Sequence, residues 1–437
     1  MKYISVTSPG SHMSKPIFNY FDDYLVSLGE PATSKAWTLQ QIARHMQKLV
    51  SEKPDDAGLY LDSGGFQIIV GYVTLSRIQE YIDSYQFALD RYSDDIDRIF
   101  SLDVWNDKLT DQEVYDLNAY STTESIDLIK QTPAIADKQL FVMQTSNEMT
   151  FTTWKKLFTE LEVYKHYKLW SIGGLVGLKK KTNARFSHAV PATLWLLTYQ
   201  KHYDFTIDQV HWLGQSSRLS FLAMALMERL YGINMTSDSS QLVRFAALEH
   251  KLPYIVEKDG EFKLIGSIDD VKSEMIVNHS IPEARCYVNS RGSGQMKELI
   301  GGVNDDYQVF TKESWAIAQA DDQQNDSHFE VTPLQFLEET GRLDNQTFIE
   351  LQSQNLSADL KFGDFIADMI MDKGLDAFTD EQQLRDLHPI LNRGRTALEL
   401  MNNINIFKQF KDIVSNGDLA AADQIMLDIV RSPAYTK

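Results

Sequence analysis

A short segment at residues 62–67 combines a carboxylate, two glycines, an aromatic ring and an amide, in the order Asp-Ser-Gly-Gly-Phe-Gln. The glycines allow a sharp turn and the close approach of a flat ligand. Asp62 can accept hydrogen bonds or transfer a proton, Phe66 can stack, and Gln67 can both donate and accept. The segment therefore suits a planar, polar ligand such as a nucleobase, although a capped turn after a strand is the plainer interpretation of these residues alone.

Polar residues and glycines follow other short apolar runs in the same way; they are Asp103, Gln144, Gly173, Gly174, Gly214, Gln215 and Asp238. Strand ends are polar in general, so each position alone is a weak signal. Six strand ends of this kind, three of them with a carboxylate, indicate a shared site. In a barrel of parallel strands all of them would lie on the C-terminal rim, where barrel enzymes place their active sites.

The chemistry that these residues suggest is work at an anomeric carbon, where one carboxylate attacks and another handles protons. We expect no histidine or cysteine beside the carboxylates, which argues against a Ser-His or Cys-His hydrolase. A metal site built on carboxylates stays open as an alternative. His188, His211 and His388 are interpreted as packing or surface residues rather than as ligands.

The elements that must position these residues alternate between strands and helices. Helical periodicity spans 76–91 and 217–230, and alternation of this kind is typical of parallel βα units. The number of strands favours an α/β fold of the TIM type, a (β/α)₈ barrel, over an open sheet. We place the eighth strand at 252–256, and the other strands at 3–6, 58–61, 98–102, 139–143, 168–172, 209–213 and 232–235.

Composition bounds the possible partners. The chain has 437 residues, of which 43% are hydrophobic and 24% charged, as is ordinary for a globular protein. We find no apolar run long enough for a membrane span and no secretory signal. A net charge of −19 gives no global attraction to nucleic acid. Contact with nucleic acid would need a local basic patch, and a solvated loop is an equally good interpretation of the candidate residues, Lys179, Lys180, Lys181 and Arg185.

Three regions are expected along the chain: a barrel at 1–300, an acidic link at 301–330 and a helical region at 331–437. The helical region either packs against the barrel or serves nucleic-acid docking or dimerisation, so a homodimer is possible. One cysteine, Cys286, excludes an intramolecular disulfide and fits a reducing compartment. It also excludes a cysteine-rich zinc site.

The residues at these strand ends carry a resemblance to a known family. The segment at 62–67 resembles the hallmark of tRNA-guanine transglycosylases, and the later motifs occur in the same order and at similar intervals. They are Phe-Ser-Leu-Asp at 100–103, Phe-Val-Met-Gln at 141–144, Ile-Gly-Gly-Leu-Val at 172–176, Trp-Leu-Gly at 212–214 and Asp-Ser-Ser at 238–240. The resemblance covers roughly residues 1–300 and implies a pentosyltransferase.

This resemblance implies a mechanism and a role for each residue. Asp238 would attack C1′ of a guanosine and form a covalent glycosyl-enzyme intermediate, and a 7-deazaguanine would then replace guanine. Asp62 would be the general acid and base. No cofactor is implied beyond the incoming base. The base-binding set would be Phe66, Asp103, Gln144, Gly173, Gly174 and Leu213, with Phe66 and Leu213 sandwiching the ring.

Departures from the family bear on the substrate. The family members that act on tRNA hold a structural zinc ion with three cysteines and a histidine, and this chain has only Cys286 in that region. We therefore expect no structural zinc and DNA as the substrate, as in the zinc-lacking relatives of phages and bacterial DNA-modification clusters. The archaeal-like pattern after Gly174 favours 7-cyano-7-deazaguanine (preQ0) as the incoming base. The protein would work in the cytoplasm, the host cytoplasm if it is phage-encoded. A divergent zinc-free tRNA enzyme and a non-catalytic partner subunit are the alternatives.

Overall fold

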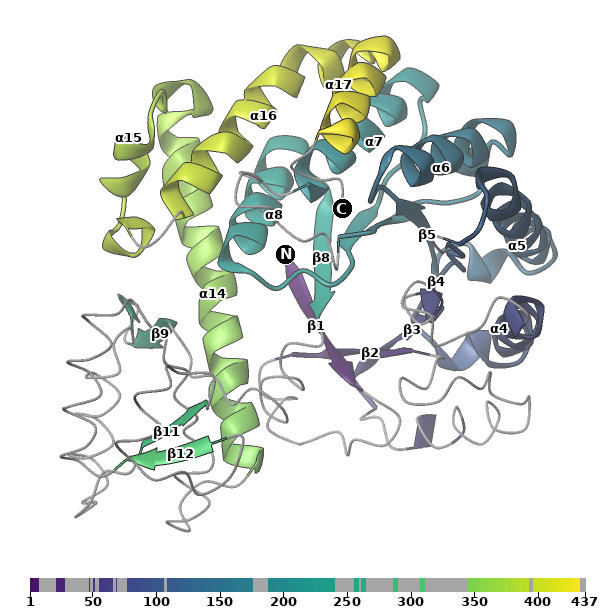
Figure 1. The fold of residues 1–437 in the computed structure, drawn as a ribbon, viewed down its shortest axis with the longest axis horizontal. Helices are drawn as coiled ribbons and strands as arrows, with labels where there is room; N and C mark the ends of the chain where they lie inside the picture. The colour runs from purple at the N-terminus through teal and green to yellow at the C-terminus, as the bar shows by residue number, and fades with distance from the viewer. Residues whose placement is uncertain are drawn as a thin grey trace. The chain divides into compact units, whose positions relative to one another are not determined.

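Eight parallel strands close into a barrel in chain order, and helices alternate with them on the outside, so the fold is the expected TIM-type barrel (Figure 1). The barrel closes where β1 pairs with β8. The strands are β1 Lys2–Thr7, β2 Asp23–Ser27, β3 Gly58–Asp62, β4 Arg98–Phe100, β5 Gln139–Gln144, β6 Leu169–Gly173, β7 Gln209–Trp212 and β8 Asn234–Ser239.

The computed structural model describes part of the chain: residues 1–7, 21–27, 47, 50–51, 55–65, 68, 77–105, 108–175, 188–239, 345–392 and 396–432, and four short strands between 255 and 310. It divides into two compact units. The first holds Met1–Met13, Phe21–Ser239 and Leu360–Lys437, and the second holds Ser14–Tyr20 and Ser240–Asp359. The boundaries predicted at residues 300 and 330 lie outside the described residues and stay predictions.

Seven of the eight barrel strands were predicted from the sequence, but the eighth was placed wrongly. The missing strand is β2, which pairs with β1 and β3. Its apolar stretch is only Tyr-Leu-Val, bounded by Asp23 and Ser27, so its sequence signal is short. The predicted strand at 252–256 overlaps β9 (Ile255–Lys258), which pairs antiparallel with β10 (Glu261–Leu264) in a separate sheet. The other small sheet joins β11 (Cys286–Asn289) to β12 (Tyr307–Phe310).

Helices follow the third to the seventh strand, and local capping explains where several of them begin and end. They are α4 Ile78–Tyr92, α5 Asp111–Gln131, α6 Glu148–Glu160, α7 Ala189–Tyr203 and α8 Arg218–Tyr231. Thr110 and Glu113 form a capping box at the start of α5, and Ser217 caps α8. Gly232 ends α8 with a φ of 67°, a conformation that glycine adopts without steric cost. These ends fix where each chain segment re-enters the barrel.

The strands bury both of their faces, which is why they read as continuous apolar runs. Inward side chains fill the barrel with a cluster that includes Ile4, Tyr60 and Phe100. Outward side chains such as Leu59 and Leu61 pack against α4. Side chains alternate along a strand, so each strand also has inward-facing positions near its ends. Polar residues at these positions lie at the two ends of the barrel.

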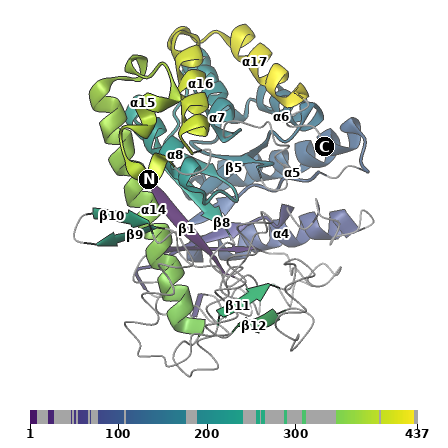
Figure 2. The same ribbon diagram turned by 60° about the vertical axis from the view of Figure 1, so that its left-hand side comes forward.

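Helices from residues 360–432 cover one side of the barrel (Figure 2). They are α15 Glu381–Arg385, α16 Thr396–Asn416 and α17 Leu419–Arg431, together with the part of α14 (Asn345–Lys373) that begins at Leu360. The helices α16 and α17 pack on α7, and every residue from 189 to 199 in α7 is buried as a result. For residues 360–432 the expectation of packing against the barrel is confirmed, whereas docking and dimerisation stay predictions.

Asp423 in α17 is a polar anchor of this packing. Its Oδ1 accepts hydrogen bonds from Trp195 Nε1 at 2.8 Å and from the Tyr199 hydroxyl at 2.9 Å. Its other oxygen pairs with Lys155 of α6. One carboxylate thereby joins α17 to two barrel helices. Within the described part of the chain, no helix is long and apolar enough to cross a membrane.

Candidate functional site

The C-terminal ends of the strands carry the polar residues that the sequence singled out. Asp62, Gln144 and Gly173 are the last residues of β3, β5 and β6, and Asp238 is the penultimate residue of β8. Asp103 lies three residues beyond the end of β4. Hydrogen bonds define two groups on this rim, one around Asp103 and one around Asp238.

The turn after β3 is built to hold Asp103. The Ser63 hydroxyl donates to Asp103 Oδ1 at 2.9 Å, and the Gly65 amide donates to Ser63 Oγ at 3.3 Å. Gly64 has a φ of 79°, which favours glycine. A Cβ added at Gly65 would lie 2.2 Å from Asp103 Oδ1. The two glycines thus let the turn close directly onto the carboxylate.

Gln144 completes the first group. Its Nε2 donates to Asp103 Oδ2, while its Oε1 is buried and has no hydrogen-bond partner among the described residues. Buried polar atoms in proteins are nearly always paired, so an unpaired amide oxygen indicates a missing partner. A Cβ at Gly173 would lie 2.6 Å from Gln144 Nε2, and one at Gly174 would lie 2.8 Å from Oε1. The Gly-Gly turn therefore makes the space that this amide occupies.

The environment of Asp103 disfavours its charged form. Asp103 is 4% exposed, and burial raises its pKa to about 7, with a further rise from the nearby Asp62 carboxylate. Hydrogen bonds from Ser63 and Gln144 oppose this rise. Tyr81 donates its hydroxyl to the Ser63 carbonyl, and burial raises the pKa of Tyr81 well above its usual value, so it remains a donor. Asp103 can therefore change its charge near neutral pH.

The second group surrounds Asp238. Two nitrogens lie 2.9 Å from its Oδ1: the backbone amide of Gly214, which donates, and Nε2 of His211. No hydrogen bond to Oδ2 comes from the described residues, and Asp238 is 7% exposed. This arrangement stabilises a carboxylate through one oxygen and keeps the other available for reaction.

The sequence-based interpretation of His211 was incomplete. It was expected to be a packing or surface residue, and the carboxylates were expected to lack a histidine partner. The structure buries His211 fully in β7 and bonds it to Asp238. The alternation of side chains along the strand could have revealed this position of His211, because residues 209, 211 and 213 share the inward face. An inward histidine next to a rim carboxylate follows from that alternation.

The other two histidines behave as expected. His188 is buried, and burial lowers its pKa to about 4, so it is neutral. His388 is half-buried and its ring contacts Phe362 and Phe365. Within the described residues, no group of three or more His, Cys, Asp or Glu is placed to hold a metal ion.

Leu213 is half-buried and packs against the cluster inside the barrel, at the same end as Asp238. The remaining predicted site residues lie outside the described residues: Phe66, Gln67, Lys179, Lys180, Lys181 and Arg185.

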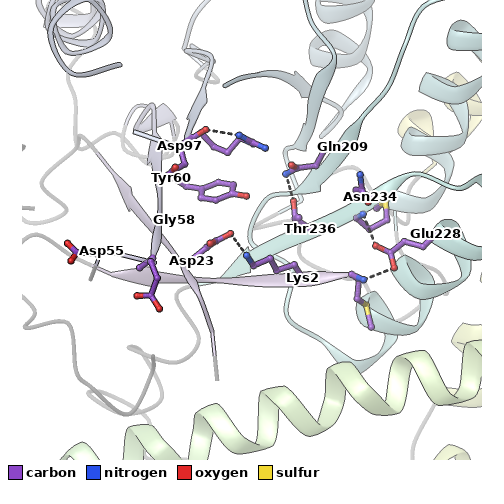
Figure 3. Close-up of a pocket in the computed structure, with 15 residues that line it drawn as sticks. Lys2, Asp23, Asp55, Gly58, Tyr60, Asp97, Gln209, Glu228, Asn234 and Thr236 are labelled. Atoms are coloured by element: carbon purple, nitrogen blue, oxygen red, sulfur yellow. Dashed lines mark hydrogen bonds and ion pairs between the residues drawn. The ribbon is translucent and has the colours of Figure 1, made fainter. Parts of the chain in front are cut away.

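A cavity of about 590 Å³ opens at the opposite, N-terminal end of the barrel (Figure 3). Residues at the starts of strands line it, including Lys2, Asp23 and Gln209. Lys2 and Asp23 form an ion pair at 2.8 Å across it. Barrel active sites are built from the loops at the C-terminal ends of the strands, so the candidate site is the rim with Asp103 and Asp238 rather than this cavity.

No protein-family model matches the chain. A search of curated proteins likewise finds no match. What the fold and the candidate site define is therefore a class: a TIM-type barrel whose C-terminal rim holds a carboxylate–amide pair and a second carboxylate bonded to histidine.

Proposed function

We propose that the protein is a guanine transglycosylase that exchanges guanine in DNA for a 7-deazaguanine. The observation that carries the proposal is the pair formed by Asp103 and Gln144. A guanine edge presents two N–H donors beside a carbonyl acceptor. Asp103 would accept from the two donors through the lone pairs that Ser63 and Gln144 leave free, and the second Nε2 hydrogen of Gln144 would donate to the carbonyl. The pair therefore matches the edge of guanine and of a 7-deazaguanine alike.

Asp238 is the nucleophile in this proposal. Its Oδ2 attacks C1′ of the nucleoside, the C1′–Oδ2 bond forms and the bond from C1′ to the base breaks. The leaving guanine takes a proton from Asp62. The incoming base then returns a proton from its ring nitrogen to Asp62 as it attacks C1′, and the C1′–Oδ2 bond breaks. The two half-reactions balance without an oxidant, a reductant or a nucleotide triphosphate.

The arrangement of carboxylates supports these roles. Asp62 lies near enough to Asp103 to raise the pKa of Asp103, so the two carboxylates are neighbours on the rim. Asp238 receives its hydrogen bonds from a different strand and loop. Retaining chemistry at a sugar carbon uses such a division, with a nucleophile and a separate acid and base. The target base must be unpaired or flipped out before it can reach this pocket.

The choice of substrate rests on the sequence. A single cysteine cannot supply the three-cysteine zinc site of the tRNA-modifying relatives, which favours DNA. The incoming base is proposed to be preQ0, on the archaeal-like pattern that follows Gly174. With a net charge of −19, binding is expected to use a small basic patch at Lys179–Lys181 and Arg185 and to weaken as salt rises.

The test is incorporation of radiolabelled guanine or preQ0, with double-stranded DNA, single-stranded DNA and total tRNA offered in parallel. Label in DNA alone supports the proposal. Label in tRNA alone would replace it with the zinc-free tRNA enzyme. No label in any of the three, from protein whose barrel is intact by circular dichroism, would refute exchange and leave the non-catalytic subunit.

A further inference from the structure

A chain of three hydrogen bonds crosses the inside of the barrel and ends on Asp238. Gln209 Nε2 donates to Thr236 Oγ1 at 2.8 Å (Figure 3), Thr236 Oγ1 lies 2.9 Å from His211 Nδ1, and His211 Nε2 lies 2.9 Å from Asp238 Oδ1. The residues come from two neighbouring strands, because β7 and β8 pair with His211 opposite Thr236. All four are buried.

The donor from Gln209 favours one set of directions for the other hydrogen bonds. A side-chain amide N–H can only donate, so Thr236 Oγ1 accepts from Gln209 and keeps its own hydrogen for another acceptor. His211 Nδ1 is the acceptor within reach. A neutral imidazole that accepts at Nδ1 carries its proton on Nε2, and that N–H points at Asp238. The chain thereby selects one of the two tautomers of His211.

Aromatic contacts hold the ring in this orientation. The ring of Phe100 meets His211 edge-on, with centroids 4.8 Å apart and planes at 68°. The ring of Tyr60 lies 6.5 Å away and tilted. With its plane set by these neighbours and both nitrogens bonded, His211 has little freedom to turn away from the carboxylate.

We propose that His211 is a positioning residue for Asp238, held by Thr236 in the tautomer that donates from Nε2. This inference rests on the proposed function, in which Asp238 Oδ2 attacks the sugar. His211 and the Gly214 amide both bond Oδ1, and this aims Oδ2 at the substrate. In the covalent intermediate Oδ1 becomes a carbonyl oxygen, and the same two donors stabilise the charge that returns to it when the ester bond breaks.

The variants distinguish an effect on the tautomer of His211 from an effect on folding. Thr236→Val keeps the shape but removes the hydroxyl, and Thr236→Ser restores it. His211→Phe removes the donor, whereas His211→Gln can place an amide N–H near Asp238. Ser237→Ala is the matched control, since the Ser237 hydroxyl is on the adjacent residue of β8, is buried and has no hydrogen-bond partner among the described residues.

For turnover we expect Thr236→Val to lower kcat about 10-fold and His211→Phe about 100-fold, each with little change in the KM of the base. Thr236→Ser and His211→Gln should recover most or part of this loss, and Ser237→Ala should match the wild type. Unchanged kcat in both Thr236→Val and His211→Phe would overturn the proposal, as would a loss that appears only in KM.

The tautomer itself is read without turnover, by NMR of protein labelled with ¹⁵N and ¹³C in its 10 histidines. The signal missing from His211→Gln identifies His211. A neutral ring protonated at Nε2 in the wild type, and altered in Thr236→Val, supports the positioning role. A ring protonated at Nδ1 would overturn it even in an active enzyme. If the wild type had the expected tautomer but exchanged no base, the proposed function would be refuted. The positioning of Asp238 by His211 would still stand.

Discussion

Asp103 and Asp238 are two carboxylates on one rim, yet their surroundings differ. Asp103 has one donor on each oxygen, from Ser63 and from Gln144. Asp238 has both of its donors on Oδ1. A carboxylate bonded on both oxygens is fixed in its plane and can offer its remaining lone pairs to a flat partner with two donors, whereas one bonded on a single oxygen keeps the other for attack. Both residues are aspartates, so the placement of their hydrogen-bond donors, and not residue type, distinguishes the proposed base-binding carboxylate from the proposed nucleophile.

The two carboxylates also differ in the charged and polar groups that surround them. Asp103 is buried near another carboxylate, and its pKa is raised to about 7. Asp238 instead faces N–H donors from a histidine and a backbone amide. The first environment favours a group whose charge depends on what binds beside it, whereas the second holds one oxygen of the carboxylate in place.

The largest effect is expected from Asp238→Asn, which removes the carboxylate that we propose as the nucleophile. We expect base exchange to fall by about 10⁴-fold or more, with the barrel intact, because loss of a nucleophile removes the covalent route. The measurement is label incorporation together with circular dichroism. Asp137→Asn is the control, since it makes the same charge change at a side chain that is 72% exposed. Retained exchange in Asp238→Asn would contradict the chemical role of this carboxylate.

A smaller effect is expected from Gln144→Ala, which removes one member of the proposed base-binding pair, Asp103 and Gln144. We expect the KM of the base to rise about 10- to 100-fold with a smaller change in kcat, since one buried hydrogen bond to the base is lost. Calorimetric titration with guanine measures the affinity directly. If the variant lost only thermal stability and bound the base normally, Gln144 would be a structural residue and the contrast between the two carboxylates would fail.

The pH dependence of stability tests the environment of Asp103. Its pKa is about 7 in the folded protein against 3.8 as the ordinary value, so the folded state holds a proton that the unfolded chain has released. The free energy of unfolding should therefore fall by a few kcal/mol between about pH 4 and pH 7, since one pKa unit corresponds to about 1.4 kcal/mol. Urea unfolding across this range measures it, and Asp103→Asn should flatten the fall. If the free energy of unfolding fell equally in Asp103→Asn, the fall would come from other titratable groups.

The smallest effect on activity is expected from Asp423→Asn, far from both carboxylates. This change weakens the bonds to Lys155, Trp195 and Tyr199 and should cost about 1–3 kcal/mol of stability. Exchange at a temperature where the variant is folded should equal that of the wild type. If Asp423→Asn lowered kcat as much as His211→Phe does, the effect of His211→Phe could be explained by lost stability. The donors to Asp238 would then not be needed to explain it.

The sequence predicted much of this fold because a buried parallel strand leaves a strong local signal. Seven strands were found from their apolar runs, and the polar residues just past them were placed on the rim. The strand β2 was missed because its apolar stretch is three residues long. The partnership of His211 with Asp238 was missed because the two residues are 27 positions apart, and only strand register brings them together.

By itself the sequence determined the barrel class, the strand ends and the residues that lie on them, since period and turn chemistry are local properties. Tertiary structure decided which carboxylate has which neighbours: Gly65 pressed onto Asp103, Gln144 left with an unpaired oxygen, and two donors gathered on one oxygen of Asp238. These contacts join residues from different strands, and hydrogen-bond geometry and burial, which set charge and reactivity, exist only once those strands have closed into the barrel.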